Sequence, residues 1–187
     1  MLKAAILSTS LLFPLAAISA PVTYTIDPAH TYPHFSVSHL GFSTLHGRFN
    51  KTEGTIVLDQ EANTGSVKVV IDAASVDTAH NKRDEHLRNA DFLNAVEFPE
   101  ITYQSSKVTI NGDSATVEGE LTILGVSKPV TLDVSKISCG VHPFNKKEVC
   151  GFDATAQINR KDFGITYGSP AIGDILELKF GVEGIKK

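Results

Sequence analysis

The sequence lacks the features by which many enzymes are recognised. It has no tryptophan, its one methionine is Met1, and its two cysteines, Cys139 and Cys150, do not form a CxxC pair. It also has no G-x-S-x-G motif for a nucleophilic serine and no glycine-rich loop that opens a helix for a phosphate. The carboxylates are scattered over turns. We therefore predict that the protein is not an enzyme and has no catalytic residues.

A long apolar run occurs once, at the N-terminus. Lys3 precedes the nearly uninterrupted apolar stretch 4–18, and the small residues Ser19 and Ala20 follow it, which is the order found in a secretory signal peptide. The stretch is shorter than the roughly 20 apolar residues of a membrane-spanning helix. We expect a signal peptide over residues 1–20, cut after Ser19 or Ala20, and one exported domain over residues 21–187. A retained N-terminal anchor is the alternative.

Positive charge is scarce in the expected domain. The whole chain has 17 lysines and arginines against 21 aspartates and glutamates, and removing Lys3 leaves 16 against 21, a net charge of −5. This balance argues against nucleic acid as a partner and against an anionic membrane surface as the main one. The chain shows no internal repeat, linker or low-complexity tract, which favours a single domain.

The two cysteines lie eleven positions apart. Export to an oxidising compartment favours a disulfide between Cys139 and Cys150. The segment between them has the turn residues Pro143 and Asn145 at its centre. We predict a hairpin closed by a disulfide, which would stabilise the fold by roughly 3 kcal/mol.

Apolar residues alternate with polar ones through most of the chain, the period of a strand with one buried face. Residues 26–49 predict a hairpin that turns at Gly41, whereas residues 80–93 predict a short helix, with Asn81 as N-cap, and one further turn. Further strands are expected at 54–59, 66–72, 100–105, 107–111, 115–124, 130–135, 149–159 and 175–183. The pattern predicts an antiparallel sandwich or barrel with one helical insertion.

Four histidines, His30, His34, His39 and His46, crowd the first hairpin. A metal site needs ligands that converge on one point, but His34 and His39 have opposite parity on a strand and would point to opposite faces. We therefore predict no metal ligands. A histidine-based metal or haem site is the alternative.

Two further questions stay open at this level. In residues 160–168, Arg160 and Asp162 could bind a polar ligand group through charge-assisted hydrogen bonds, or an Arg–Asp pair could close the end of a barrel. The interior of an eight-stranded barrel is either filled by side chains or holds one small ligand, and the pattern favours neither.

Four segments resemble one known family. They are IDPAHTYPHFSVSHLGFSTLHGRF (26–49), KRDEHLRNADFLNAVEFPEITYQS (82–105), GELTILGVSKPVTL (119–132) and INRKDFGI (158–165). In this order they are similar to the YceI family, exported polyisoprenoid-binding proteins with a lipocalin-like barrel. The Cys139–Cys150 pair departs from the general family pattern.

The resemblance implies an all-β fold, an extended eight-stranded antiparallel barrel with a short helical insertion near residues 80–93. It also implies a periplasmic location and a lumen that holds an amphiphile with a long isoprenoid tail, an isoprenoid quinone or a polyprenyl lipid. No cofactor, metal or enzymatic step belongs to this picture. The rival is a structural or stress-response module that acts through its outer surface.

Strand parity then gives a predicted lumen set: Phe35, Val37, Val69, Ile71, Tyr103, Leu121, Ile123, Val134, Ile158 and Phe180. The head-group candidates are the polar residues within the matching segments: His30, Arg83, Asp84, His86, Arg160 and Asp162. The partner expected is a long-chain isoprenoid lipid. Transient contact with a membrane or a membrane protein, and a homodimer through an exposed edge near the first hairpin, are left open.

Overall fold

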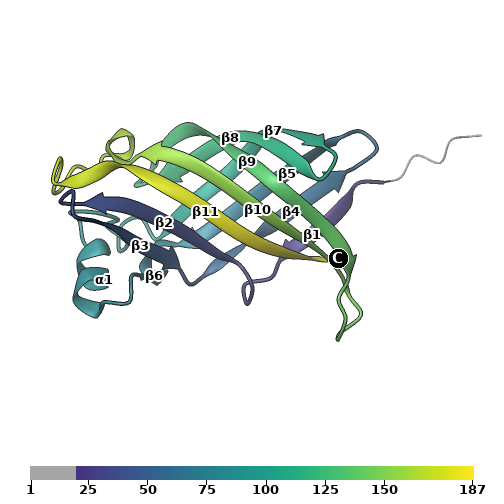
Figure 1. Cartoon of the computed structure of the whole chain (residues 1–187), viewed down its shortest axis with the longest axis horizontal. Helices are drawn as coiled ribbons and strands as arrows, with labels where there is room; N and C mark the ends of the chain where they lie inside the picture. The colour runs from purple at the N-terminus through teal and green to yellow at the C-terminus, as the bar shows by residue number, and fades with distance from the viewer. Residues whose placement is uncertain (1–19) are drawn as a thin grey trace, which may run out of the picture.

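Eight antiparallel strands close into an elongated barrel in the computed structural model, which describes residues 20–187 (Figure 1). In spatial order, and with β1 pairing β11 to complete the ring, the strands are β1 (Val22–Ile26), β4 (Thr52–Asp59), β5 (Thr64–Asp72), β7 (Glu100–Asn111), β8 (Ser114–Ile123), β9 (Val126–Val141), β10 (Glu148–Asn159) and β11 (Ile172–Lys186). The all-β barrel expected from the sequence is confirmed. The expected signal peptide lies outside the described residues, except for Ala20.

The last strand, β11, has two partners along one edge. Its C-terminal part, Gly184–Lys186, pairs with β1, whereas Ile172–Gly181 pairs with β2 (Tyr32–His39). The sheet continues from β2 to β3 (Ser43–Phe49) and β6 (Val76–Asp77). The barrel therefore has a hairpin end, where β1 closes it and the β9–β10 hairpin projects, and a helix end with β2, β3, β6 and α1 (Asn81–Leu87) (Figure 1).

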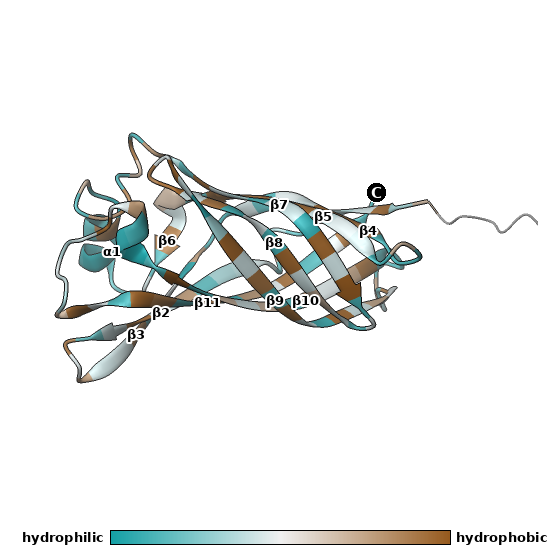
Figure 2. Cartoon of the chain, turned by 90° about the horizontal axis from the view of Figure 1, so that it is seen from above, coloured by the Kyte–Doolittle hydropathy of each residue, from teal (hydrophilic) through white to brown (hydrophobic). Residues whose placement is uncertain are grey.

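Alternation along each strand produces the barrel wall. In β8, Val117, Leu121 and Ile123 are buried, while Glu118 and Glu120 are exposed. Figure 2 shows the same alternation as apolar and polar bands across β8, β9 and β10. The pattern places one apolar face toward the lumen and one polar face toward solvent.

The structure corrects several boundaries. The expected strands 100–105 and 107–111 form one strand, β7, with a register shift between Ser105 and Lys107. This irregularity puts Tyr103 and Val108, which have opposite parity, on the same buried side, so the sequence resembles two strands. Strands β1 and β6 were not expected. The N-cap of α1 is His80 and not Asn81, because the His80 ring accepts a hydrogen bond from the Arg83 N–H.

Short 3-10 helices occupy Ala73–Ser75 (η1), after β5, and Arg160–Phe163 (η2), between β10 and β11. Within residues 20–187, the structure contains no helix with the length and apolar character that a membrane crossing requires.

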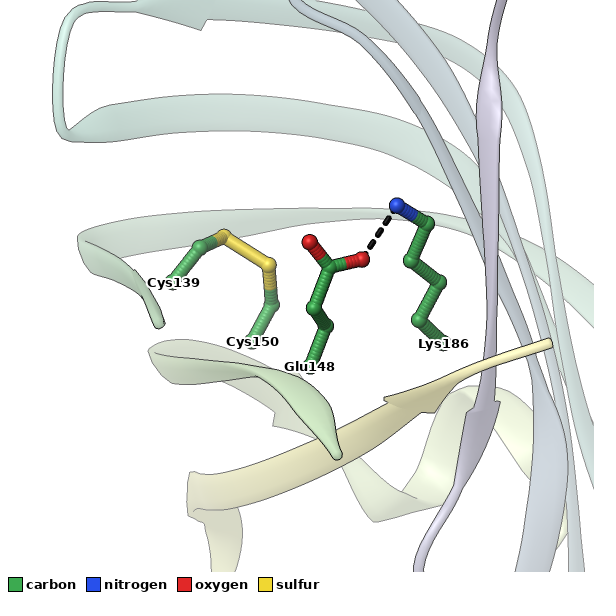
Figure 3. The surroundings of a disulfide bond; sticks show 4 residues. All are labelled: Cys139, Glu148, Cys150 and Lys186. Atoms are coloured by element: carbon green, nitrogen blue, oxygen red, sulfur yellow. Dashed lines mark ion pairs between the residues drawn. A yellow bond between two sulfur atoms is a disulfide. The ribbon is translucent and has the colours of Figure 1, made fainter. Parts of the chain in front are cut away.

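The expected disulfide is present at the hairpin end. Cys139 and Cys150 face each other in the register of β9 and β10 and are joined through their sulfur atoms (Figure 3). Beside it, the Glu148 carboxylate pairs with the Lys186 ammonium and connects β10 to β11. The disulfide therefore joins the two strands of the hairpin to each other, and the ion pair joins the hairpin to β11.

Candidate functional site

Two cavities lie end to end inside the barrel. The larger one, about 310 Å³, lies at the helix end, and the smaller one, about 110 Å³, lies toward the hairpin end. Residues that line both form a waist between them: Pro33, Ile71, Leu121, Leu178 and Phe180. The larger cavity alone is at the lower end of the range of small-molecule sites, roughly 300–1,000 Å³. The two cavities adjoin at the waist, and the protein's own side chains fill neither of them; together they are called the lumen.

The smaller cavity has an apolar wall. No charged residue lines it, and its two polar members, Thr31 and Tyr103, are both buried and hydrogen-bonded. The Tyr103 hydroxyl lies 3.0 Å from the carbonyl oxygens of Val117 and Val130, to which it donates. Burial raises the pKa of Tyr103 to about 12, so its side chain stays neutral at physiological pH. A polar head group would lose its hydration here without replacement, whereas a hydrocarbon chain would not.

Two glycines make room for aromatic rings of the wall. The Phe35 ring lies across Gly47, where an added Cβ would come within 2.3 Å of it, and the Tyr103 ring lies across Gly119, where the distance would be 2.7 Å. Any larger residue at Gly47 would push the Phe35 ring, which lines the larger cavity. These glycines therefore set the width of the lumen.

The structure places every member of the predicted lumen set in the wall of at least one cavity. Those in the larger cavity alone are Phe35, Val37, Ile123 and Ile158; those in the smaller alone are Val69, Tyr103 and Val134; those at the waist are Ile71, Leu121 and Phe180. Their contact with a ligand stays a prediction.

Polar side chains gather at the helix end, and none of those lining the larger cavity is acidic. Arg83 and His86 reach this cavity from α1. Arg83 donates from Nε and Nη2 to the Thr78 hydroxyl and carbonyl, both at 2.7 Å, and its Nη1 has no partner among residues 20–187. The helix end of the lumen, called the mouth below, can therefore offer the unused Nη1 of Arg83 to a ligand.

An aromatic group surrounds His86. Its ring meets the rings of Phe92 and Tyr167 edge-on, with centroids 5.0 Å apart in both cases, and its Nε2 lies 3.0 Å from Asp91 Oδ2. Burial, together with the charges of Arg48 and Lys179, lowers the pKa of nearby His34 and favours its neutral form. The helix end thus combines apolar rings with a few hydrogen-bonding groups.

Arg160 lines the larger cavity but is fully engaged. Its guanidinium donates to the carbonyl oxygens of Ile165, Tyr167, Ile172 and Gly173 at 2.8–3.2 Å. Its Nη2 also lies 3.5 Å from the Asp174 carboxylate. Four of the five N–H groups of the guanidinium thus donate to carbonyl oxygens, and all three of its nitrogens are engaged within the protein. Of the two roles left open by the sequence, the geometry favours closure of the barrel end, with Asp174 as the partner.

The structure does not bring the other three head-group candidates to the cavity. Asp162 is exposed on η2. Asp84 is buried, but it accepts hydrogen bonds from the Thr78 N–H and hydroxyl and so fixes the segment before α1. His30 lies in the loop between β1 and β2, away from α1, and pairs with Asp27 at 2.9 Å. Arg83 and His86 are the candidates that remain available.

Sequence reasoning missed part of the wall. Leu176 and Leu178 share the parity of Phe180, so the period of two could have identified them. Phe92, Leu93 and Tyr167 also line the larger cavity, but they lie outside the strands. Strand parity carries no information about such residues.

The comparisons with known proteins agree with this geometry. Residues 24–184 match the YceI-like domain family. A UPF0312 protein of Pseudomonas aeruginosa is 41% identical over 167 residues, which are 88% of this chain and 87% of that protein. The YceI protein of Campylobacter jejuni superposes with a TM-score of 0.69 at 29% identity, over 80% of this chain and 90% of that one.

A more distant structure shares the fold alone. It is a polyisoprenoid binding domain from Saccharophagus degradans, with a TM-score of 0.63 at 17% identity, over 88% of this chain and 98% of that one. Family and fold agree with the barrel that the structure shows. The chain belongs to the YceI-like domain family.

Proposed function

We propose that the protein is a periplasmic carrier that holds a long-chain isoprenoid amphiphile, an isoprenoid quinone or a polyprenyl lipid, in its lumen. The observation that carries the proposal is the unfilled interior, which continues from the larger cavity past Leu121 and Phe180 into a charge-free smaller cavity. The polyisoprenoid binding domain of similar fold supports the choice of lipid class.

The energetics favour retention of such a lipid. Burying about 20 tail carbons at about 0.8 kcal/mol each gives roughly 16 kcal/mol. Ordering the tail and losing its translational freedom costs about 4–15 kcal/mol. The difference, about 1–12 kcal/mol, favours binding before any head-group contact is counted. The lumen would therefore select by length and width more than by functional group.

The polarity of the two cavities determines which end of the ligand lies in which cavity. The tail lies in the smaller cavity, because that cavity has no charged residue, and the head group lies at the helix end. There the free Nη1 of Arg83 can donate to a head-group oxygen, and the ring of His86, whose Nε2 is paired with Asp91, can contact the head group. Since the lining holds no carboxylate, the mouth suits a neutral or anionic head group better than a cationic one.

The helix end also suits transient contact with a membrane or membrane protein. Leu40 and Phe42, in the turn between β2 and β3, are 50% and 89% exposed. Tyr167, which lines the larger cavity, is 48% exposed. Apolar side chains beside the mouth would shorten the path of a lipid tail through water.

Extraction of the bound lipid tests the proposal. The protein is purified without detergent from a lipid-replete host, extracted with organic solvent, and the extract is analysed by mass spectrometry. We expect a prenyl or related long-chain lipid in an amount comparable to the protein. An extract without such a lipid would count against the carrier function.

A further inference from the structure

A second polar cluster lies at the hairpin end, where β11 changes partner from β2 to β1. Because β2 pairing ends at Gly181 and β1 pairing begins at Gly184, the loop 27–31 between the two strands leaves the barrel beside Glu183. Asp27 and His30 belong to this loop. The topology therefore brings residues from distant parts of the chain together at one point.

Three side chains converge there in a geometry that suits a metal ion. The Nδ1 of His30 lies 2.9 Å from Asp27 Oδ2 and 4.0 Å from Glu183 Oε2, and all three ligand atoms lie within 4.8 Å of one another. Among residues 20–187, which the structure describes, this is the one group of three potential metal ligands. The imidazole nitrogen and two carboxylate oxygens are a mixed donor set typical of Zn²⁺ sites.

The backbone around the cluster is held in place. The Asp27 N–H donates to the Glu183 carbonyl at 2.8 Å, and the Glu183 N–H donates to the buried Thr31 hydroxyl at 3.1 Å. The Ala29 N–H donates to Asp27 Oδ1 at 2.9 Å, which orients the carboxylate and leaves Oδ2 toward His30. The three side chains are thus presented by a loop that is already fixed to β11.

Three protein ligands leave the fourth position of a tetrahedral ion to water, as in the zinc sites that have three protein ligands.

We propose that Asp27, His30 and Glu183 bind a divalent transition-metal ion of the Zn²⁺ class. Two carboxylates balance the charge of the ion, and imidazole nitrogen favours Zn²⁺ and its neighbours over Mg²⁺ or Ca²⁺. The bound ion joins the β1–β2 loop to β11 at the hairpin end. This site is separate from the lumen and does not depend on lipid binding. It differs from the expectation, based on sequence, of no metal ligands.

Zn²⁺ titration of the oxidised protein tests the site. The protein carries no polyhistidine tag and is treated with EDTA before isothermal titration calorimetry with ZnCl₂. We expect one Zn²⁺ per chain and a higher unfolding temperature, which EDTA reverses. His30→Ala and Glu183→Gln are each expected to weaken binding by at least about 10-fold, the loss that even an outer-shell partner can cause.

His46→Ala is the matched control, because His46 is also an exposed histidine but belongs to β3. It should bind Zn²⁺ as the unmodified protein does. The proposal is overturned if the unmodified protein binds no stoichiometric Zn²⁺, if His30→Ala binds as tightly as it does, or if His46→Ala loses as much affinity as His30→Ala. Circular dichroism of each variant shows whether the fold is retained.

Discussion

Replacing Leu121 with arginine is expected to abolish lipid retention. Leu121 is 8% exposed and lines both cavities at the waist of the lumen. A guanidinium at this point would block the path of the tail between the cavities. It would also place a charge in an apolar space, which a hydrocarbon tail cannot compensate. The lipid recovered per protein by solvent extraction should fall to background.

The adjacent residue on β8 gives a matched control. Glu120 is exposed on the outer face, so Glu120→Arg adds the same side chain outside the lumen and should leave lipid recovery unchanged. Leu121→Trp narrows the waist without a buried charge and should also lower the recovery of long-tailed lipids. It distinguishes a blocked lumen from unfolding, which the buried charge of Leu121→Arg could cause. Normal recovery from both Leu121 variants would show that the waist is not on the ligand path.

Replacing Arg160 with methionine is expected to lower the free energy of unfolding by at least about 3 kcal/mol. Arg160 is 3% exposed, and its guanidinium satisfies four carbonyl oxygens between Ile165 and Gly173. The variant would also leave Asp174 Oδ1, which is buried and accepts no hydrogen bond from residues 20–187, without its ion-pair partner. Urea denaturation followed by circular dichroism measures the change.

Lys161 provides the comparison for Arg160, since its ammonium pairs with the same carboxylate, at 3.3 Å, from an exposed position. An exposed pair contributes about 0–1 kcal/mol, so Lys161→Met should have little effect. If Arg160→Met were no less stable than Lys161→Met, the network of carbonyl hydrogen bonds would not be what closes the helix end.

The strands could be predicted because their information is local, whereas the barrel, as opposed to a sandwich, followed from the resemblance to the family. A period of two marks each wall strand, and the inward parity of Phe35, Leu121 and Phe180 follows from it directly. Where the period breaks, as between Ser105 and Lys107, the sequence shows two strands and the structure shows one. The register shift depends on pairing with β8, which no local pattern records.

The polar residues of the site were harder to predict because their roles depend on distant partners. His30 and Arg83 both lie in segments that resemble the family, yet they lie at opposite ends of the barrel. The strand β11 pairs with β2 toward the helix end, where Arg83 lies, and with β1 at the hairpin end, where His30 lies. Arg160 and Asp162 are two positions apart, but the partner of Arg160 is Asp174, which the turn after η2 brings back. Proximity in sequence identified the right segments and not the contacts.

A crystal structure of the protein purified without detergent tests the central claim most directly, since that claim concerns what occupies the lumen. We expect one elongated ligand, with its head near Arg83 and His86 and its tail passing Leu121 toward Phe152. A lumen filled by inward movement of the protein's own side chains, with Phe35 and Phe180 packed together across the waist, would contradict the account.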